Sequence, residues 1–172
     1  MIVLGVDPGT LRTGWGVVRR VGSRLQGIDA GIIHAGRDAP LAQRLLAIYE
    51  GLSAIVERHH PNCMAVEDVF SKHARSALVL GQARGVALLV GARAAIEVSA
   101  YPPALVKRSV AGSGQAPKDQ LARIVGAILG WTNLPAADAT DALAIAITHA
   151  NAALLKRASA PRANSLPGRS GL

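Results

Sequence analysis

The sequence predicts an α/β protein with a mixed five-stranded sheet, in which three antiparallel strands precede parallel strands and helices cover both faces. Three apolar runs occupy the first 36 residues and are separated by the turns Pro8-Gly9 and Gly22-Ser23, as in consecutive antiparallel strands. Beyond them, two more short apolar runs alternate with helical patterns. The first run is apolar at nearly every position, as a strand buried on both faces would be.

The strands and the first helix follow in order. Strands are expected over residues 2–7, 14–20 and 25–36. A helix is expected from Pro40 to His59-His60, because apolar residues recur there at spacings of three and four. These residues are Leu41, Leu45, Ile48, Leu52 and Ile55. The short apolar run over residues 62–68 predicts the fourth strand.

The remaining elements are mostly helical. Residues 75–96 predict a long helix that is apolar nearly all round and rich in Gly and Ala. Such a helix lies either in the centre of a fold or, in part, at an interface between protein molecules. Residues 97–101 predict the last strand. Three helices are then expected, over residues 102–110, 118–129 and 136–155.

One domain is expected over residues 1–156, a length sufficient to bury a substantial core. From residue 157 to residue 172 the composition changes to Arg, Ser, Pro and Gly with no acidic residue. Such a composition buries little apolar surface and predicts a disordered basic tail.

The charge of the chain favours polyanionic partners. Its 172 residues include 19 Lys and Arg against 11 Asp and Glu, which gives a formal net charge of +8 and a pI of about 10.8. Nucleic acid is the first candidate and an acidic membrane surface the second, although a solvated basic surface needs no partner. Cys63 is the only cysteine, which fits a reducing, cytoplasmic setting and excludes a cysteine-based zinc site. Neither a signal peptide nor a membrane span is expected.

Acidic residues stand at the ends of three apolar segments. Asp7 and Glu67 close two probable buried strands, and Asp138 and Asp141 lie in the first turn of the last helix. If the two strands are parallel neighbours, their terminal carboxylates emerge side by side at the edge where open α/β sheets bind ligands. The first turn of the last helix would then bring Asp138 and Asp141 over the same edge.

Four carboxylates at one edge require compensating charge. Two carboxylates about 4 Å apart repel each other by about 4 kcal/mol even at an effective dielectric constant near 20. Oxygen-only ligands suit Mg²⁺, with Mn²⁺ as a substitute, and two ions roughly 3.5–4 Å apart are typical of enzymes that cleave phosphodiesters. The acids therefore predict a divalent metal site that activates water.

Each acid also has a simpler interpretation. Asp7 precedes Pro8-Gly9 and would suit a turn residue. Glu67 would suit a solvated strand end, with Asp68 as a competing candidate for the site. Asp138 and Asp141 would suit a helix N-terminus, where acids stabilise the helix dipole.

Four motifs together strongly resemble the RuvC family, the bacterial Holliday junction resolvases. They occur in the expected order from residue 1 to about residue 155. They are Asp7-Pro8-Gly9-Thr10 with Thr13-Gly14-Trp15-Gly16, Val66-Glu67-Asp68-Val69-Phe70, residues 77–85, and Asp138-Ala139-Thr140-Asp141.

The resemblance implies an RNase H-like fold and a homodimer that nicks four-way DNA junctions symmetrically with Mg²⁺. It implies that the metal-binding, catalytic acids are Asp7, Glu67, Asp138 and Asp141. Some relatives have histidine where this chain has Asp138, so an all-carboxylate site is expected here. The resemblance also implies a working partnership with the RuvA–RuvB branch-migration complex.

DNA-contacting residues are carried over from the family in the same way. Lys107 and Lys118 match basic residues near the scissile phosphate, where Lys118 would also serve catalysis, and Phe70 matches a loop aromatic that stacks on junction bases. Lys72 lies in the same loop as Phe70 and is expected to contact DNA. Taken alone, lysines are usually just solvated, and a single loop aromatic also packs locally.

The sequence thus predicts a crossover junction endodeoxyribonuclease of homologous recombination and DNA repair. Its products would be 5′-phosphate and 3′-hydroxyl ends. A non-catalytic junction-binding protein and a generic RNase H-like nuclease remain alternatives. An actin-like ATPase shares the Asp-x-Gly-Thr pattern but needs two such domains, and no G-x-x-x-x-G-K-[ST] motif is present, so no nucleotide cofactor is expected.

Overall fold

The structure, a computed structural model, describes residues 1–68 and 74–159. Its sheet contains β1 (Ile2–Asp7), β2 (Arg12–Val21), β3 (Arg24–His34), β4 (Cys63–Glu67) and β5 (Glu97–Tyr101). The strand order is β3-β2-β1-β4-β5. β1, β2 and β3 pair antiparallel, whereas β4 is parallel to both β1 and β5. The predicted mixed five-stranded sheet is confirmed.

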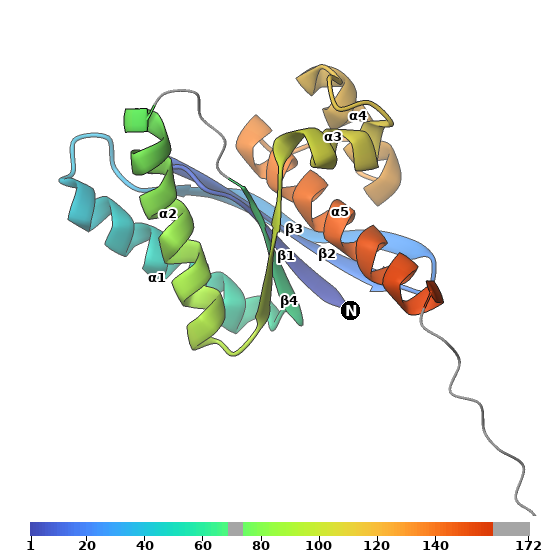
Figure 1. Ribbon diagram of the computed structural model, residues 1–172, viewed down its shortest axis with the longest axis horizontal. Coiled ribbons are helices and arrows are strands. Elements are labelled where there is room, and N and C mark those ends of the chain that lie inside the picture. The colour runs from blue at the N-terminus through green and yellow to red at the C-terminus, as the bar shows by residue number, and fades with distance from the viewer. Residues whose placement is uncertain (69–73, 160–172) are drawn as a thin grey trace, which may run out of the picture.

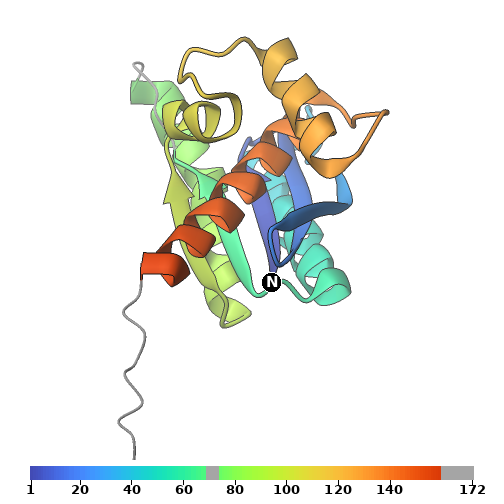
Figure 2. The same cartoon turned by 90° about the vertical axis from the view of Figure 1, so that its right-hand side faces the viewer.

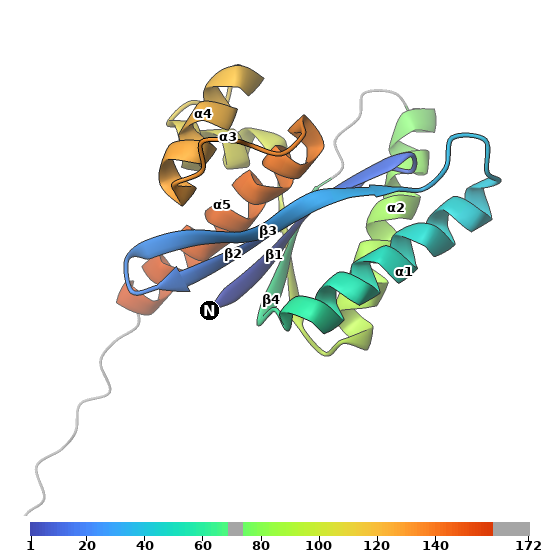
Figure 3. The same ribbon diagram turned by 180° about the vertical axis from the view of Figure 1, so that it is seen from behind.

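Helices cover both faces of the sheet, as predicted (Figures 1 and 3). α1 (Leu41–His59) and α2 (Ala74–Arg93) lie on one face. α3 (Pro103–Ala111), α4 (Lys118–Leu129) and α5 (Ala137–Ser159) lie on the other. Figure 2 shows α5 running diagonally across its face of the sheet. Among the described residues, no helix has the length and apolar character that crossing a membrane requires.

The alternation of side chains along the strands divides the core into two clusters. In β1, Leu4 and Val6 pack with α1 and α2, whereas Val3 packs with α5. In β4, Met64 and Val66 pack with the first group of helices, and Cys63 and Ala65 with the second. Since successive side chains of a strand point to opposite faces, the next odd-numbered residues, Asp7 and Glu67, belong to the α5 face.

Three glycines allow α5 to lie unusually close to the sheet. A Cβ atom on Gly5 would overlap the carbonyl oxygen of Ala142, and one on Gly14 would overlap that of Asp138. A Cβ atom on Gly16 would lie 2.7 Å from the side chain of Leu143. Glycine within strands marks close approach of another backbone. Here it brings the first turn of α5 down onto β1 and β2, beside Asp7.

Two helix ends differ from the prediction. α2 ends at Arg93 rather than Ile96, because Ala95 has a left-handed φ of 54° and the amide of Ile96 donates to the carbonyl of Gly91. Glycine usually takes that position, so the sequence carries no stop signal there. α5 continues to Ser159 instead of Leu155, because Lys, Arg and Ala are good helix formers. Residues 160–172 of the expected tail lie outside the described residues.

Candidate active site

Asp7 and Glu67 lie side by side at the ends of neighbouring parallel strands. The register pairs Val6 of β1 with Val66 of β4, one residue before each acid. The two carboxyl side chains share a hydrogen bond. The predicted meeting of these two strand ends is therefore confirmed by the strand register.

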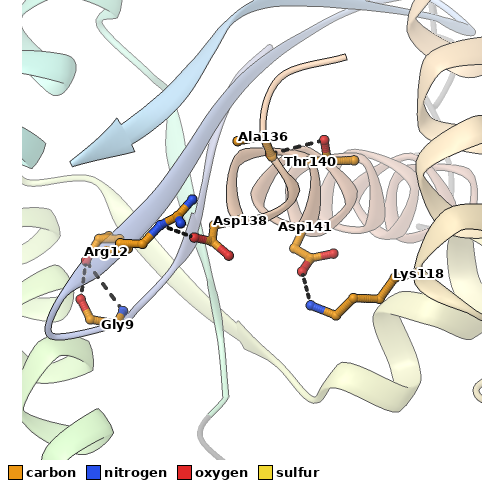
Figure 4. A network of polar contacts seen from close by, with 8 residues as sticks. Gly9, Arg12, Lys118, Ala136, Asp138, Thr140 and Asp141 are labelled. Carbon is orange, nitrogen blue, oxygen red and sulfur yellow. Dashed lines mark hydrogen bonds and ion pairs between the residues drawn. The ribbon is translucent and has the colours of Figure 1, made fainter. Parts of the chain in front are cut away.

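Asp138 and Asp141 enter the same region from α5. Asp138 is the second residue of the helix and Asp141 lies one turn further along. The first turn is held by the amides of Ala139 and Thr140, which both donate to the carbonyl of Ala136. The buried Thr140 hydroxyl donates to the carbonyl of Pro135 at 3.1 Å. This fixed turn sets where the two carboxylates project (Figure 4).

Two basic side chains bind the α5 acids (Figure 4). Nε of Arg12 lies 2.8 Å from Oδ2 of Asp138, and Nζ of Lys118 lies 2.9 Å from Oδ2 of Asp141. Arg12 comes from the start of β2 and Lys118 from the start of α4. The carboxylate of Asp138 is thus occupied by an ion pair, and the helix-dipole interpretation alone does not account for its surroundings.

The protonation of Asp7 and Glu67 reflects their crowding. Burial, followed by the charges of Asp141 and Asp138, raises the pKa of Asp7 to about 6, and Lys118 opposes the rise. Burial, followed by the charges of Asp7 and Asp141, raises the pKa of Glu67 to about 8. A hydrogen bond from Lys118 to Asp141 raises the pKa of that lysine. At neutral pH the Asp7–Glu67 pair therefore retains a proton.

A cavity of about 360 Å³ opens at this edge of the sheet. Three of the acids line it, together with two basic residues and three apolar ones. The lining residues are Asp7, Glu67, Pro103, Val106, Lys107, Lys118, Leu121 and Asp141. The cavity thus joins acids from β1, β4 and α5 to lysines from α3 and α4. Asp138 stands beside it, turned toward Arg12.

The donor set of the site suits a hard divalent cation. It consists of carboxylate oxygens whose burial, followed by their mutual repulsion, raises two pKa values, and a bound cation would relieve that repulsion. Within residues 1–68 and 74–159, no three His, Cys, Asp or Glu side chains are gathered closely enough to hold a metal ion as they stand. Asp138 and Asp141 are paired with Arg12 and Lys118, so a bound metal would compete with these two basic side chains for the carboxylates.

The structure also separates Glu67 from its competitor Asp68. The backbone amide of Asp68 donates to the carbonyl of Tyr101, and its carboxylate lies 3.4 Å from Arg84 on α2. Glu67, and not Asp68, lines the cavity. Phe70 and Lys72, the two loop residues expected to contact DNA, lie outside the described residues.

Sequence reasoning missed Arg12 and the glycines beneath α5. Arg12 carries no motif of its own, and its contact with Asp138 joins two segments far apart in the chain. The glycines did leave a signal. Gly5, Gly14 and Gly16 interrupt two strand patterns, and glycine inside a strand indicates close approach of another backbone.

Comparisons with known proteins give a consistent result. The family model described as crossover junction endodeoxyribonuclease RuvC matches residues 3–149. The relative from Geobacter sulfurreducens is 47% identical over 157 residues, covering 91% of this chain and 96% of its own. The relative from Afipia carboxidovorans is 48% identical over 150 residues, covering 87% and 88%. Both are named crossover junction endodeoxyribonuclease RuvC.

Solved structures agree with the sequence comparisons. T. thermophilus RuvC, solved in complex with a Holliday junction substrate, superimposes with a TM-score of 0.85 at 33% identity, covering 91% of this chain and 96% of that one. The yeast mitochondrial Holliday junction resolvase Ydc2 has a TM-score of 0.58 at 13% identity, covering 85% and 77%, which supports the fold alone. The expected RNase H-like fold is confirmed. The chain belongs to the RuvC family of crossover junction endodeoxyribonucleases.

Proposed function

We propose that this protein is a structure-selective endonuclease that resolves Holliday junctions by paired, symmetric nicks during homologous recombination and DNA repair. The observation that carries the proposal is the convergence of Asp7 and Glu67, at adjacent strand ends, with the two acids of the first turns of α5. The net charge of +8 supports it, because a basic surface around an acidic site lets phosphates approach the carboxylates.

The four carboxylates Asp7, Glu67, Asp138 and Asp141 are proposed to hold Mg²⁺, two ions per site, with Mn²⁺ as a substitute. When bound, the ions activate a water molecule for attack on phosphorus and stabilise the leaving 3′ oxygen. Asp7 interacts with each of the other three acids, so it is the carboxylate most suited to being shared. The hydrolysis leaves a 5′ phosphate and a 3′ hydroxyl.

Lys118 and Lys107 are proposed to bind the phosphate under attack. Both line the cavity that holds the acids. Lys118 is 71% exposed and bound at 2.9 Å to Asp141, so its ammonium group is accessible to an incoming phosphate. Placed there, its charge would stabilise the negative charge that develops during hydrolysis. By family resemblance, Phe70 is proposed to stack on junction bases and Lys72 to contact DNA.

The protein is proposed to act as a homodimer with α2 at the interface. Leu78 and Leu89 on this helix are 68% and 57% exposed, although both are large apolar residues. Between them, a Cβ atom on Gly81 or Gly85 would meet nothing within 4 Å. These four residues lie on one face of α2 at helical spacing. A two-fold partner would cover this face and supply the second active site that paired nicking needs.

The cellular setting is proposed from the family. The protein would work in the cytoplasm with the RuvA–RuvB branch-migration complex, acting on the junction that this complex moves. Four-way junction DNA is its proposed substrate.

The test is cleavage of a synthetic four-way junction compared with linear duplex DNA, in Mg²⁺ and in Mn²⁺. The wild-type protein should place paired nicks in the junction and leave the duplex intact. Asp7→Asn should lower the rate roughly 100-fold or more, as the loss of one preorganised electrostatic group does. Asp119→Asn is the matched control, because Asp119 is an exposed residue of α4 whose carboxylate lies 3.6 Å from Arg123. This variant should cut the junction at the wild-type rate.

The other outcomes separate the alternatives. Tight junction binding without nicks in either metal would indicate a non-catalytic junction-binding protein. Cleavage of RNA–DNA hybrids without preference for junctions would indicate a generic RNase H-like nuclease. A folded Asp7→Asn variant that cuts at the wild-type rate would remove Asp7 from the site.

A further inference from the structure

Arg12 contacts the acid cluster, which consists of Asp7, Glu67, Asp138 and Asp141, through its ion pair with Asp138. No sequence motif identified this residue. Its Nε atom is 2.8 Å from Oδ2 of Asp138, and Figure 4 shows Arg12 and Lys118 on two sides of the α5 acids. Each α5 acid thus has one basic partner, while Asp7 and Glu67 share a hydrogen bond with each other. Two ion pairs and one shared hydrogen bond thus offset most, but not all, of the charge of the four carboxylates.

The backbone directs Arg12 to this place. Arg12, Gly14 and Gly16 alternate along β2 and therefore share the face that α5 covers. The preceding turn is held by Thr13, whose hydroxyl donates to the carbonyl of Gly9 at 2.8 Å. A Cβ atom on Gly9 would overlap the carbonyl oxygen of Arg12. The guanidinium group is thus carried by a tight turn and a strand, and not by a free loop.

The stability of α5 does not explain a cation at this position. The N-terminal end of a helix carries a partial positive charge, which favours acids and disfavours bases. Arg12 approaches that end of α5, so the helix dipole opposes it. The carboxylate of Asp138 is the group that attracts it. The contact therefore has to be understood through the charge of the acid cluster.

We propose that Arg12 is an internal counter-cation of Asp138 that competes with the divalent metal and so sets how tightly the site binds it. This inference rests on the proposed function, in which Asp138 is a metal ligand. A carboxylate oxygen held by a guanidinium must give up or weaken that bond to bind Mg²⁺ at its usual distance of about 2.0–2.1 Å. The guanidinium and the metal ion also repel each other across the shared acid.

The exposure of the pair makes this competition modest and reversible. The side chain of Arg12 is 51% exposed and that of Asp138 is 32% exposed. Ion pairs with this much solvent contact are weak, so a divalent ion can displace the arginine. Removing the competitor should therefore tighten metal binding by roughly two- to fivefold.

The experiment measures Mn²⁺ and Mg²⁺ affinity of the full-length protein without DNA, by titration calorimetry at low salt. Arg12→Gln should bind Mn²⁺ roughly two- to fivefold more tightly than the wild-type protein, and Arg12→Lys, which keeps the charge, should lie between them. Arg19→Gln is the control, because Arg19 is an exposed residue of the same strand, and its affinity should match the wild type. Circular dichroism checks that each variant is folded.

The double variant identifies the acid through which Arg12 acts. Asp138→Asn should weaken Mn²⁺ binding, and adding Arg12→Gln to it should change the affinity no further. If Arg12→Gln binds Mn²⁺ as the wild type does, or more weakly, while Asp138→Asn still loses affinity, the inference is wrong and the metal site stands. If Asp138→Asn leaves the affinity unchanged, the proposed ligand set fails, and the competition at Asp138 fails with it.

Discussion

The Asp7–Glu67 pair connects the folding of this protein to its proposed chemistry. Their pKa values rise to about 6 and about 8 because burial and neighbouring carboxylates disfavour the charged forms. The unfolded chain would release these protons near the ordinary values for Asp and Glu. The folded, metal-free protein therefore binds more protons than the unfolded chain between about pH 4 and pH 8. Within that window, stability falls as the pH rises.

This difference in proton binding predicts a pH-dependent melting temperature in EDTA. The melting temperature should fall between pH 6 and pH 8.5 by at least about 2–4 °C, the shift that 1 kcal/mol produces in a domain of this size. Glu67→Gln removes the group with the larger rise in pKa and should reduce the fall, whereas Asp119→Asn should not. Adding Mn²⁺ at pH 8.5 should restore stability to the wild-type protein. A melting temperature that rises over this range, or an unchanged slope in Glu67→Gln, would contradict the assignment.

Single residues also show what sequence reasoning reaches and what it misses. Asp7 and Glu67 could be predicted because an acid at the end of an apolar run can be recognised in the sequence itself. The alternation of side chains along each strand then determines on which face of the sheet the acid lies. The ion pair between Arg12 and Asp138 could not be predicted, because it depends on the distance between the start of β2 and the first turn of α5. These two residues are 126 positions apart in the sequence. The same holds for Lys118 and Asp141 as an ion pair.

At the scale of elements, the packing of α5 on β1 and β2 decides whether a site exists. The sequence predicts each strand and helix to within a few residues, because periodicity and turns are local. It does not predict how closely a helix lies on a sheet. That distance depends on Gly5 and Gly14, where any side chain would overlap the backbone of α5.

Gly14→Ala tests this packing. The added methyl would overlap the carbonyl oxygen of Asp138, so the first turn of α5 must shift and carry its acids away from Asp7. We expect a loss of about 1–3 kcal/mol in stability together with weaker Mn²⁺ binding and slower junction cleavage. The measurements are chemical unfolding, calorimetry and cleavage.

Gly31→Ala is the control for Gly14→Ala. A Cβ atom there would lie 2.9 Å from the Trp15 ring, on the face of β2 that packs with α1. The Gly31→Ala variant should therefore be less stable than the wild type but bind metal with unchanged affinity. Equal loss of metal affinity in both variants would mean that general destabilisation, and not the position of α5, governs the site.

At the scale of the whole molecule, the number of active sites has to match the symmetry of the substrate. A four-way junction is resolved by two opposed nicks, whereas one chain carries one group of acids. Asp7 and Glu67, two of the proposed active-site acids, lie at one end of β1 and β4, and α2 lies on the sheet face opposite α5 (Figures 1 and 3). A two-fold contact through α2 would therefore leave both cavities open to DNA.

Leu89→Glu tests the dimer. A glutamate in the middle of an apolar contact loses hydration without gaining a partner. The dissociation constant of the dimer should therefore be at least about tenfold higher in the variant than in the wild type, which corresponds to about 1.4 kcal/mol. Analytical ultracentrifugation measures this, and cleavage should change from paired to single, unlinked nicks. Leu46→Glu on α1 is the control, since Leu46 is 54% exposed against 57% for Leu89. If both variants keep the wild-type dimer and paired nicking, α2 does not form the interface.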